Sequence, residues 1–300
     1  MKLGPIATAM VTPFDERGAL DTAEAARLAR WLVDRGNDAL VVAGSTGEGQ
    51  TLDDVERYEL VKAVKDGVGA RATVIANVGT SATRETIAAA HRALEAGADA
   101  LLVVVPYYNK PTQTGMLRHF GAVADAVALP QIVYNIPSRT AANMLPETLL
   151  QLAHDHRNVI AVKESSGDLR QIATIVRNRP HGFQVLAGDD PLFLPCLAIG
   201  ADGVVGVASH LCSREFRQMY DAFSEGRVAE AAATHASLLP LFDALFRVTN
   251  PIPVKWAMAQ LGFRVGACRS PLDDLPDSVA SELRPVVADF ADPDMTAVVA

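Results

Sequence analysis

The sequence predicts an α/β protein, a (β/α)8 TIM barrel over residues 1–224 with a C-terminal helical appendage over residues 225–300. Eight short apolar runs rich in β-branched residues recur about 20 to 35 residues apart, as strands do. Amphipathic patterns with the period of a helix lie between them. After residue 213 the apolar runs stop and only helical patterns remain. Repeated strand–helix units of this number are typical of a closed parallel barrel.

The predicted strands are nearly continuous apolar runs, which is typical of strands buried on both faces. They cover residues 6–12, 39–43, 73–77, 100–106, 131–135, 159–163, 184–188 and 203–207. A doubly wound open sheet is the alternative to a barrel. The count of eight strands, and the lack of a GxGxxG motif after the first of them, favour the barrel.

The predicted helices carry their apolar residues along one stripe, as Leu28 and Leu32 do in the first of them. Capping residues precede several helices, namely Asp21 or Thr22, Asp53, Ser81 and Asp168. We expect barrel helices over residues 23–35, 53–65, 83–96, 114–126, 146–154, 169–178 and 214–224, and appendage helices over 228–246, 251–261 and 274–288. We expect the tail DPDMTAVVA, residues 292–300, to be disordered.

Composition and charge disfavour several classes of partner. The chain has 300 residues, 49% hydrophobic and 21% charged, which is enough for a large core. Its net charge is −8 and it has no Lys/Arg-rich run, so we expect no nucleic-acid partner and no membrane partner. We expect no signal peptide, and the longest apolar run is far shorter than the roughly 18 residues of a membrane span. Three scattered cysteines without a CxxC motif indicate a reducing compartment, so we expect a cytoplasmic location.

Polar residues cluster just after the predicted strands. A barrel brings the C-terminal ends of its strands to one face, where barrel enzymes carry out their chemistry. These segments include GSTGEG (44–49), PYYNKP (106–111), YNIPSRT (134–140), KESSGD (163–168) and GDDP (188–191). We therefore expect one face to gather a lysine, tyrosines, an arginine, hydroxyl groups and a glycine-rich turn.

Lys163 is the lysine that ends a strong apolar strand. Burial disfavours the charged form of an amine, and a neutral amine can attack a carbonyl to form a Schiff base. The alternative is a lysine that reaches solvent or pairs with Glu164. The polar residues expected on the same face favour the catalytic interpretation.

The turn GSTGEG has the composition of a small anion site. Its glycines allow backbone N–H groups to point at a carboxylate, and no lysine follows as it would in a Walker loop. The alternative is an ordinary turn in which Ser45 and Thr46 cap the next helix. Tyr134 ends the fifth strand, where its phenol could carry protons with the Thr46 hydroxyl as partner.

Other polar residues on this face have more than one interpretation. Arg139 could hold a substrate carboxylate or form a surface ion pair. Tyr107 and Tyr108 could serve the site or pack at an interface. Asp189 and Asp190 follow the seventh strand, so they disfavour a phosphorylated substrate, and we expect them to cap the next helix. We find no cluster of metal ligands and expect no metal.

The motifs GSTGE, PYYNKPTQ, YNIPSRT, VKESSGD, GDD and NPIPVKWA (250–257) together resemble the dihydrodipicolinate synthase family. This family belongs to the pyruvate-dependent class I aldolases, which include N-acetylneuraminate lyase. The resemblance covers residues 4 to about 290. It implies a barrel with C-terminal helices, usually a homotetramer built from two tight dimers. It also implies condensation of pyruvate with L-aspartate 4-semialdehyde to 4-hydroxy-tetrahydrodipicolinate, in the diaminopimelate route to lysine.

The resemblance also implies roles for single residues. Lys163 would form a Schiff base with pyruvate, so that no metal or organic cofactor is needed. Tyr134 would shuttle protons, with Thr46 and Tyr108 completing a relay. The family places the tyrosine that matches Tyr108 in the site of a neighbouring subunit.

The implied substrate-binding residues come from four of the strand ends. Ser45 and Thr46 would hold the carboxylate of pyruvate. Arg139 would hold the carboxylate of the aldehyde substrate at the mouth of the site. Gly188 and Val205 would line the site through backbone and apolar contacts.

The sequence departs from the synthase pattern at Ser45, where synthases usually have a second threonine. The motif GSTGE also occurs in the neuraminate lyases, whereas Arg139 and the motif PYYNKP favour the synthase. The alternatives are a pyruvate aldolase acting on a sialic acid or a keto-deoxy sugar acid, and a non-catalytic barrel that binds a small acid. Intact Lys163, Tyr134 and Thr46 weigh against the non-catalytic barrel.

Some members of the family are inhibited by lysine at a dimer interface. Glu85 and Tyr107 match that site. Gly49, Asp54 and Arg57 replace the serine and the histidines of the inhibited type. We therefore expect weak or absent inhibition by lysine.

Overall fold

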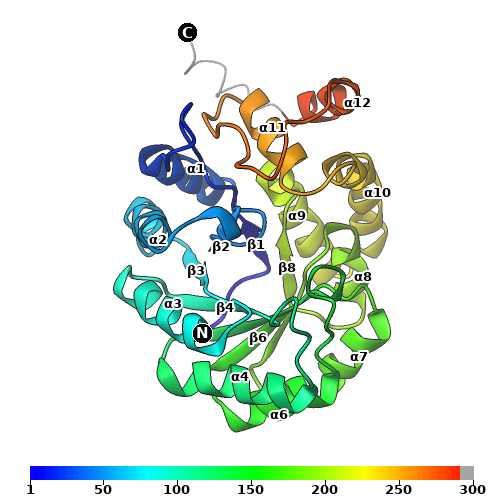
Figure 1. Ribbon diagram of the computed structural model, residues 1–300. Coiled ribbons are helices and arrows are strands. Elements are labelled where there is room, and N and C mark those ends of the chain that lie inside the picture. The colour runs from blue at the N-terminus through cyan, green and yellow to red at the C-terminus, as the bar shows by residue number, and fades with distance from the viewer. Residues whose placement is uncertain (291–300) are drawn as a thin grey trace.

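Eight parallel strands form a closed barrel in the computed structural model, which describes residues 1–290 (Figure 1). Each strand pairs with the next along the chain, and β1 pairs with β8 to close the ring. The predicted fold class is confirmed, and the tail DPDMTAVVA lies outside the described residues. The strands are β1 (Ile6–Ala9), β2 (Ala39–Val42), β3 (Thr73–Asn77), β4 (Ala100–Val104), β5 (Gln131–Asn135), β6 (Val159–Glu164), β7 (Gln184–Ala187) and β8 (Gly203–Gly206).

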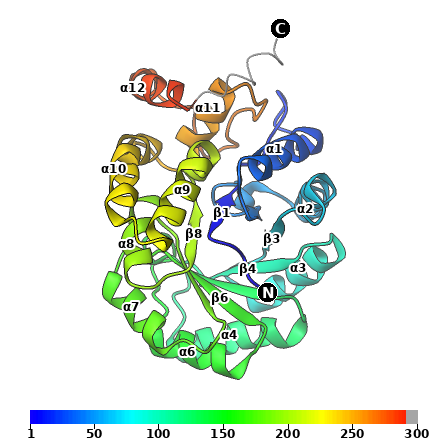
Figure 2. The ribbon, with the colours of Figure 1, turned by 180° about the vertical axis from the view of Figure 1, so that it is seen from behind.

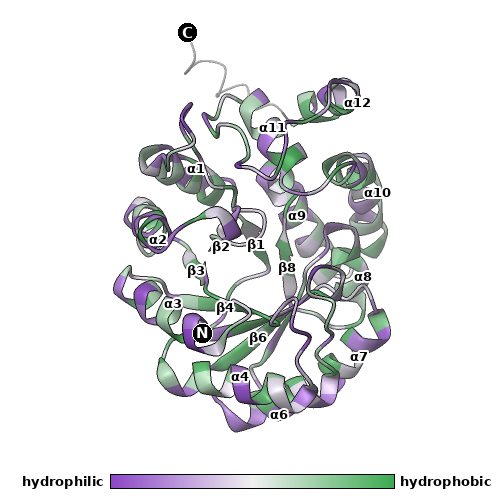
Figure 3. Cartoon of the chain, in the orientation of Figure 1, coloured by the Kyte–Doolittle hydropathy of each residue, from purple (hydrophilic) through white to green (hydrophobic). Residues whose placement is uncertain are grey.

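The strands are apolar throughout because both of their faces are buried. Successive side chains point to opposite sides of a strand. One set, which includes Ala7, Ile132 and Leu186, fills the interior of the barrel. The other set, which includes Ile6 and Val133, packs against the surrounding helices. Figure 3 shows β4 and β6 as largely hydrophobic, whereas the helices around them mix hydrophilic and hydrophobic stretches.

A ring of helices surrounds the barrel, as the two opposite views in Figures 1 and 2 show. The long barrel helices are α1 (Thr22–Asp34), α2 (Asp54–Val68), α3 (Thr83–Glu95), α4 (Gln113–Ala126), α6 (Pro146–Asp155), α7 (Leu169–Asn178) and α9 (Ser209–Ser224). Six of them lie within three residues of their predicted bounds, whereas α9 begins at Ser209 and not at the predicted residue 214.

Most of the predicted caps are present. Asp21 and Asp168 each accept a hydrogen bond from a backbone N–H in the first turn of the helix that follows, and Asp53 forms a full capping box. The predicted cap at Ser81 is wrong. Ala82 occupies that position without a side-chain bond, because α3 begins one residue later than a Ser81 cap requires.

Four short elements near the strand ends were not predicted, since so few residues cannot display a helical period. They are η1 (Gly49–Thr51), α5 (Pro137–Thr140), η2 (Asp190–Leu192) and α8 (Phe193–Ala198). The segment YNIPSRT, expected as a loop, thus contains a helical turn. This turn matters for the site because it carries Arg139.

Three helices follow α9 and make up the described part of the C-terminal region. They are α10 (Val228–Leu245), α11 (Ile252–Gln260) and α12 (Asp277–Ala288). Helix α10 packs on α9, where the rings of Phe216 and Phe242 lie 5.8 Å apart. Figures 1 and 2 show α12 beside α10, outside the ring of barrel helices. Among residues 1–290, no helix combines the length and the apolar character needed to cross a membrane.

Candidate active site

Lys163 and Tyr134 lie side by side at the C-terminal ends of adjacent strands. They are register partners across β5 and β6. The Lys163 Nζ atom lies 4.5 Å from the centroid of the Tyr134 ring. Both side chains are buried, with 5% and 7% of their surfaces exposed. The structure therefore brings together the amine and the phenol that the sequence singled out.

The alternative interpretation of Lys163, a solvent-seeking lysine or a partner of Glu164, is wrong. Adjacent strand residues face opposite sides, so Glu164 points away from the barrel interior. Its carboxylate accepts hydrogen bonds from Asn135 Nδ2 at 3.0 Å, Ser166 N at 2.8 Å and Gln171 Nε2 at 3.2 Å. Burial raises the pKa of Glu164, although these donors oppose the effect. Lys163 has no ion pair within residues 1–290.

The turn of residues 44–49 is tightly built after β2. A Cβ atom added at Gly47 would lie 2.9 Å from the Met10 carbonyl oxygen, so a larger residue would have to displace backbone. Thr46 is 2% exposed, and its Oγ1 accepts a hydrogen bond of 2.9 Å from Asn250 Nδ2. The turn is thus packed between β1 on one side and the C-terminal region on the other.

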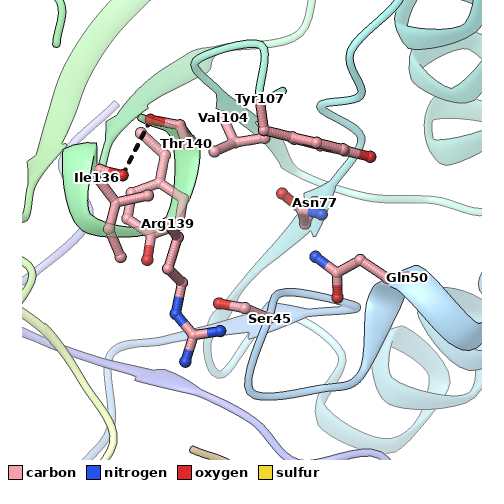
Figure 4. Close-up of a pocket in the computed structure, with 9 residues that line it drawn as sticks. Ser45, Gln50, Asn77, Val104, Tyr107, Ile136, Arg139 and Thr140 are labelled. Atoms are coloured by element: carbon pink, nitrogen blue, oxygen red, sulfur yellow. Dashed lines mark hydrogen bonds between the residues drawn. The ribbon is translucent and has the colours of Figure 1, made fainter. Parts of the chain in front are cut away.

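A cavity of about 270 Å³ opens between this turn and the ends of β3, β4 and β5 (Figure 4). Figure 4 shows Arg139 extending from α5 toward Ser45, with Tyr107 on the opposite side near Asn77. The Arg139 Nη2 atom also donates a hydrogen bond of 3.2 Å to the Asn250 carbonyl oxygen. The residues lining the cavity are Ser45, Gln50, Asn77, Val104, Tyr107, Tyr134, Ile136, Arg139 and Thr140.

Five residues named from the sequence are not among these lining residues, namely Lys163, Thr46, Tyr108, Val205 and Gly188. Lys163 lies against the Tyr134 ring, and Thr46 follows Ser45 in the turn, so both lie next to a lining residue. Tyr108 is 92% exposed, with a φ of 72°, on the outside of the chain. Val205 is buried in the barrel interior within the same apolar cluster as Tyr134. Gly188 follows β7 and has no room for a side chain, because an added Cβ would lie 1.7 Å from Ser165 Oγ.

The acidic residues after β7 differ from the expectation. Asp190 is fully buried and accepts hydrogen bonds from Val207 N at 3.1 Å and Ala208 N at 2.8 Å. It therefore caps the segment before α9, and the expectation that this pair caps the helix following β7 is wrong, since Asp189 makes no side-chain cap bond. Burial raises the pKa of Asp190 to about 6. Burial also raises the pKa of Asp189, and the charge of Lys163 opposes that shift.

The arrangement places phenols, hydroxyl groups and a guanidinium around one small cavity, with the Lys163 amine against the lining residue Tyr134. Such a set can bind a short carboxylate substrate and attack its carbonyl. Within residues 1–290, no three His, Cys, Asp or Glu side chains are grouped closely enough to hold a metal ion.

Comparison with known proteins identifies the family. A model described as the dihydrodipicolinate synthetase family matches residues 2–289. The chain belongs to this family. A 4-hydroxy-tetrahydrodipicolinate synthase from Thermosynechococcus vestitus is 48% identical to it over 288 residues, 96% of this chain and 97% of the relative. One from Moorella thermoacetica is 50% identical over 272 residues, 91% of this chain and 93% of the relative.

Solved structures of the dihydrodipicolinate synthetase family share the fold closely. A crystal structure of the enzyme from Cyanidioschyzon merolae with lysine bound has a TM-score of 0.94 and 44% identity, covering 96% of this chain and 99% of that one. A dihydrodipicolinate synthase from Bacillus anthracis has a TM-score of 0.94 and 39% identity, covering 97% and 100%. The resemblance stated from the motifs is therefore confirmed.

Sequence reasoning missed several residues of the site in this family member. Asn77 ends β3 and follows the same strand-end rule that found Tyr134, so its position could have been predicted. Gln50 and Thr140 lie in short helical turns that have no sequence period. Asn250 contacts Thr46 across 204 residues, and no local pattern indicates such a contact.

Arg57 and Asp54, two of the residues from which weak inhibition by lysine is expected, form contacts within this chain. Arg57 donates hydrogen bonds to the carbonyl oxygens of Gly49 and Leu52, the latter at 3.2 Å. Burial lowers the pKa of the Arg57 guanidinium. Asp54 accepts a hydrogen bond of 2.7 Å from Arg92. The expectation of weak lysine inhibition stays a prediction.

Proposed function

We propose that this chain is a 4-hydroxy-tetrahydrodipicolinate synthase, a lyase that condenses pyruvate with L-aspartate 4-semialdehyde in lysine biosynthesis. The observation that carries the proposal is the buried Lys163 beside the Tyr134 ring, at a distance of 4.5 Å. Tyr134 lines a small cavity that Arg139 also lines, in a chain of the dihydrodipicolinate synthetase family.

In the first step, the neutral amine of Lys163 adds to the C2 carbonyl of pyruvate. Loss of water from this adduct leaves a protonated imine, the Schiff base. The iminium draws electrons from the methyl carbon, so a methyl proton leaves and an enamine forms. No metal or organic cofactor takes part in this proposal, because the iminium itself serves as the electron sink.

In this proposal, the hydroxyl groups nearest the imine carry out the proton transfers. Tyr134 is the phenol beside Lys163, and Thr46 lies in the turn across the cavity. Tyr108 is the third member of the relay. Because its side chain is 92% exposed in the single chain, we place it in the cavity of a second copy. The resemblance to the family implies that the second copy is part of a homotetramer made of two tight dimers, and we propose this assembly here.

The second substrate is held by its carboxylate. In this proposal Ser45 and Thr46 bind the carboxylate of pyruvate, and Arg139 binds that of the aldehyde with its planar fork of donors. Gly188 and Val205 support the floor of the site. The enamine carbon attacks the aldehyde carbon, and the amine of the second substrate then attacks the imine carbon. This attack closes the ring and frees the Lys163 amine.

Ser45 supports a second candidate, an aldolase acting on a sugar acid, because the turn reads GSTGE. The contact between Arg139 and the aldehyde substrate distinguishes the synthase from the sugar-acid aldolase. A synthase should lose most of its activity in Arg139→Ala, since an unpaired substrate carboxylate costs binding and orientation. A sugar-acid aldolase should tolerate this change. A panel of aldehydes tested against wild type and Arg139→Ala provides the measurement.

Trapping with borohydride tests the Schiff base itself. The protein is incubated with pyruvate, reduced, and its mass is measured along with that of its peptides. We expect one carboxyethyl group on Lys163 and none in Lys163→Met. Lys62→Met, which removes an exposed lysine, should be labelled like wild type. A folded wild-type protein that gains no adduct would overturn the proposal.

A further inference from the structure

The motif NPIPVKWA begins with a residue that contacts both sides of the candidate site. Asn250 is 7% exposed and precedes helix α11. Its side-chain Nδ2 donates a hydrogen bond of 2.9 Å to Thr46 Oγ1. Its main-chain carbonyl oxygen accepts a hydrogen bond of 3.2 Å from Arg139 Nη2. Side chain and main chain thus serve two different residues of the site.

Asn250 is held in place independently of its own side chain. Lys255, on α11, donates a hydrogen bond of 2.6 Å to Glu48, and both side chains are almost completely buried. The second carboxylate oxygen of Glu48 accepts a hydrogen bond of 2.7 Å from the backbone N–H of Arg269. The start of α11 and the turn of residues 44–49 are therefore joined at a second point, and trimming Asn250 leaves that point intact.

The Asn250 side-chain amide donates its bond to Thr46 although the oxygen of the same amide is unsatisfied. Its Oδ1 atom is buried and has no hydrogen-bond partner within the described part of the chain. A buried polar atom without a partner costs free energy, so an apolar residue would suit this place better if packing alone mattered. This cost points to a use for the donor group.

A hydroxyl that accepts a hydrogen bond from an amide keeps its own proton for another partner. The bond from Asn250 also holds Oγ1 in one of the staggered positions available to a threonine. With Nδ2 as donor, the Thr46 proton is directed away from the C-terminal region. It is then available to an acceptor on the far side, such as a phenol oxygen or a carboxylate.

We propose that Asn250 is a positioning residue, which uses its side chain as a donor to orient the Thr46 hydroxyl for proton transfer and its main chain to hold Arg139. The inference rests on the proposed function. Its two contacts can be separated, because substitution of the side chain leaves the main-chain carbonyl that Arg139 contacts. Changes to the side chain should therefore slow the pyruvate half-reaction and leave the binding of the aldehyde unchanged.

The test uses Asn250→Ala and Asn250→Asp in the full-length protein. Aspartate keeps the shape of the side chain but offers only acceptors when ionised, at about pH 8. The pyruvate half-reaction is followed alone, as exchange of pyruvate methyl protons in D2O at saturating pyruvate. Asn158→Ala is the control, because Asn158 Nδ2 is likewise a hydrogen-bond donor, to the Ala124 carbonyl oxygen at 2.9 Å, but lies at the end of β6 opposite Lys163.

We expect both Asn250 variants to slow the exchange by about 10- to 100-fold, the usual cost of misplacing a group in a reacting site. The KM for the aldehyde should change little, and Asn158→Ala should exchange at the wild-type rate. Exchange near the wild-type rate in Asn250→Asp would overturn the donor role. An equal loss in Asn158→Ala would overturn it as well, since the effect would then follow stability alone. A wild-type protein that forms no pyruvate adduct would instead count against the proposed function.

Discussion

Two buried lysines, Lys163 in the barrel and Lys255 in the C-terminal region, lie in similar but not equal surroundings. Each places its Nζ near an aromatic ring, 4.5 Å from the Tyr134 centroid and 4.1 Å from that of Phe14. Lys255 is also paired with the carboxylate of Glu48 at 2.6 Å. Lys163 has no ion pair within residues 1–290. Both lysines contact an aromatic ring, but only Lys255 is paired with a carboxylate.

This difference separates a structural lysine from a reactive one. A carboxylate in contact stabilises the ammonium, so the paired amine stays protonated and is a poor nucleophile. Burial lowers the pKa of Lys255, and Glu48 opposes that shift. Burial and an aromatic neighbour alone therefore do not identify a Schiff-base lysine, and the partner has to be considered as well.

The largest expected effect is that of Lys163→Met. Removal of the proposed nucleophile should lower kcat by at least about 1000-fold. The free energy of unfolding should be unchanged or higher, because an apolar chain replaces a buried amine that has no ionic partner. Steady-state kinetics and urea unfolding measure the two quantities. Substantial residual activity, or a clear loss of stability, would remove the distinction between the two lysines.

The same substitution at the other lysine should have the opposite profile. Lys255→Met should lower the free energy of unfolding by about 3–5 kcal/mol, because Glu48 is left as a buried charge without its ionic partner. The double variant Glu48→Gln, Lys255→Met should recover much of this loss. The folded fraction of either variant should still trap pyruvate on Lys163. A single variant as stable as wild type would show that the pair contributes little.

The carboxylate of Asp190 should have an intermediate effect on stability, and this effect depends on pH. Burial raises the pKa of Asp190 to about 6 in the folded chain, above the value of about 3.9 expected when unfolded. The folded protein therefore holds this proton more tightly. The stability that it contributes is present at low pH and is lost as the pH rises through this window.

Asp190→Asn removes this titration, so its stability relative to wild type should rise by about 2 kcal/mol between roughly pH 4 and pH 7. Chemical unfolding of both proteins at several pH values measures the difference. The change of this stability difference with pH is the quantity to compare. The lost hydrogen-bond acceptor lowers the stability of the variant by the same amount at every pH. A difference independent of pH would contradict the prediction.

The sequence predicts the barrel well because strands buried on both faces leave an unmistakable continuous apolar run. It fails at short elements such as α5, where four residues are too few to show a period. Capping was predicted where the sequence places an acid directly before a helix, as at Asp53. It failed at Asp190, whose partners lie 17 and 18 residues further along the chain.

The same limit explains which site residues could be predicted. Lys163 and Tyr134 follow from one rule, that polar residues at strand ends meet at one face of a barrel. Asn250 and Lys255 do not, because their partners in the turn of residues 44–49 lie more than 200 positions away. The C-terminal helices were predicted as an appendage. They are present as predicted, and the contacts of Asn250 and Lys255 to Thr46 and Glu48 join this region to the turn of residues 44–49.

The smallest expected effect concerns the other side of the same turn. Arg57 fills the space beside Gly49 with a half-buried cation, which disfavours the amine of a free lysine. A serine at position 49 has no room, since an added Cβ would lie 2.0 Å from the Ala43 carbonyl oxygen. We therefore expect little inhibition by lysine in a dose–response assay. The double variant Asp54→His, Arg57→His, which removes the cation without touching Gly49, should be more sensitive than wild type. Strong inhibition of the wild-type protein at sub-millimolar lysine would contradict this account.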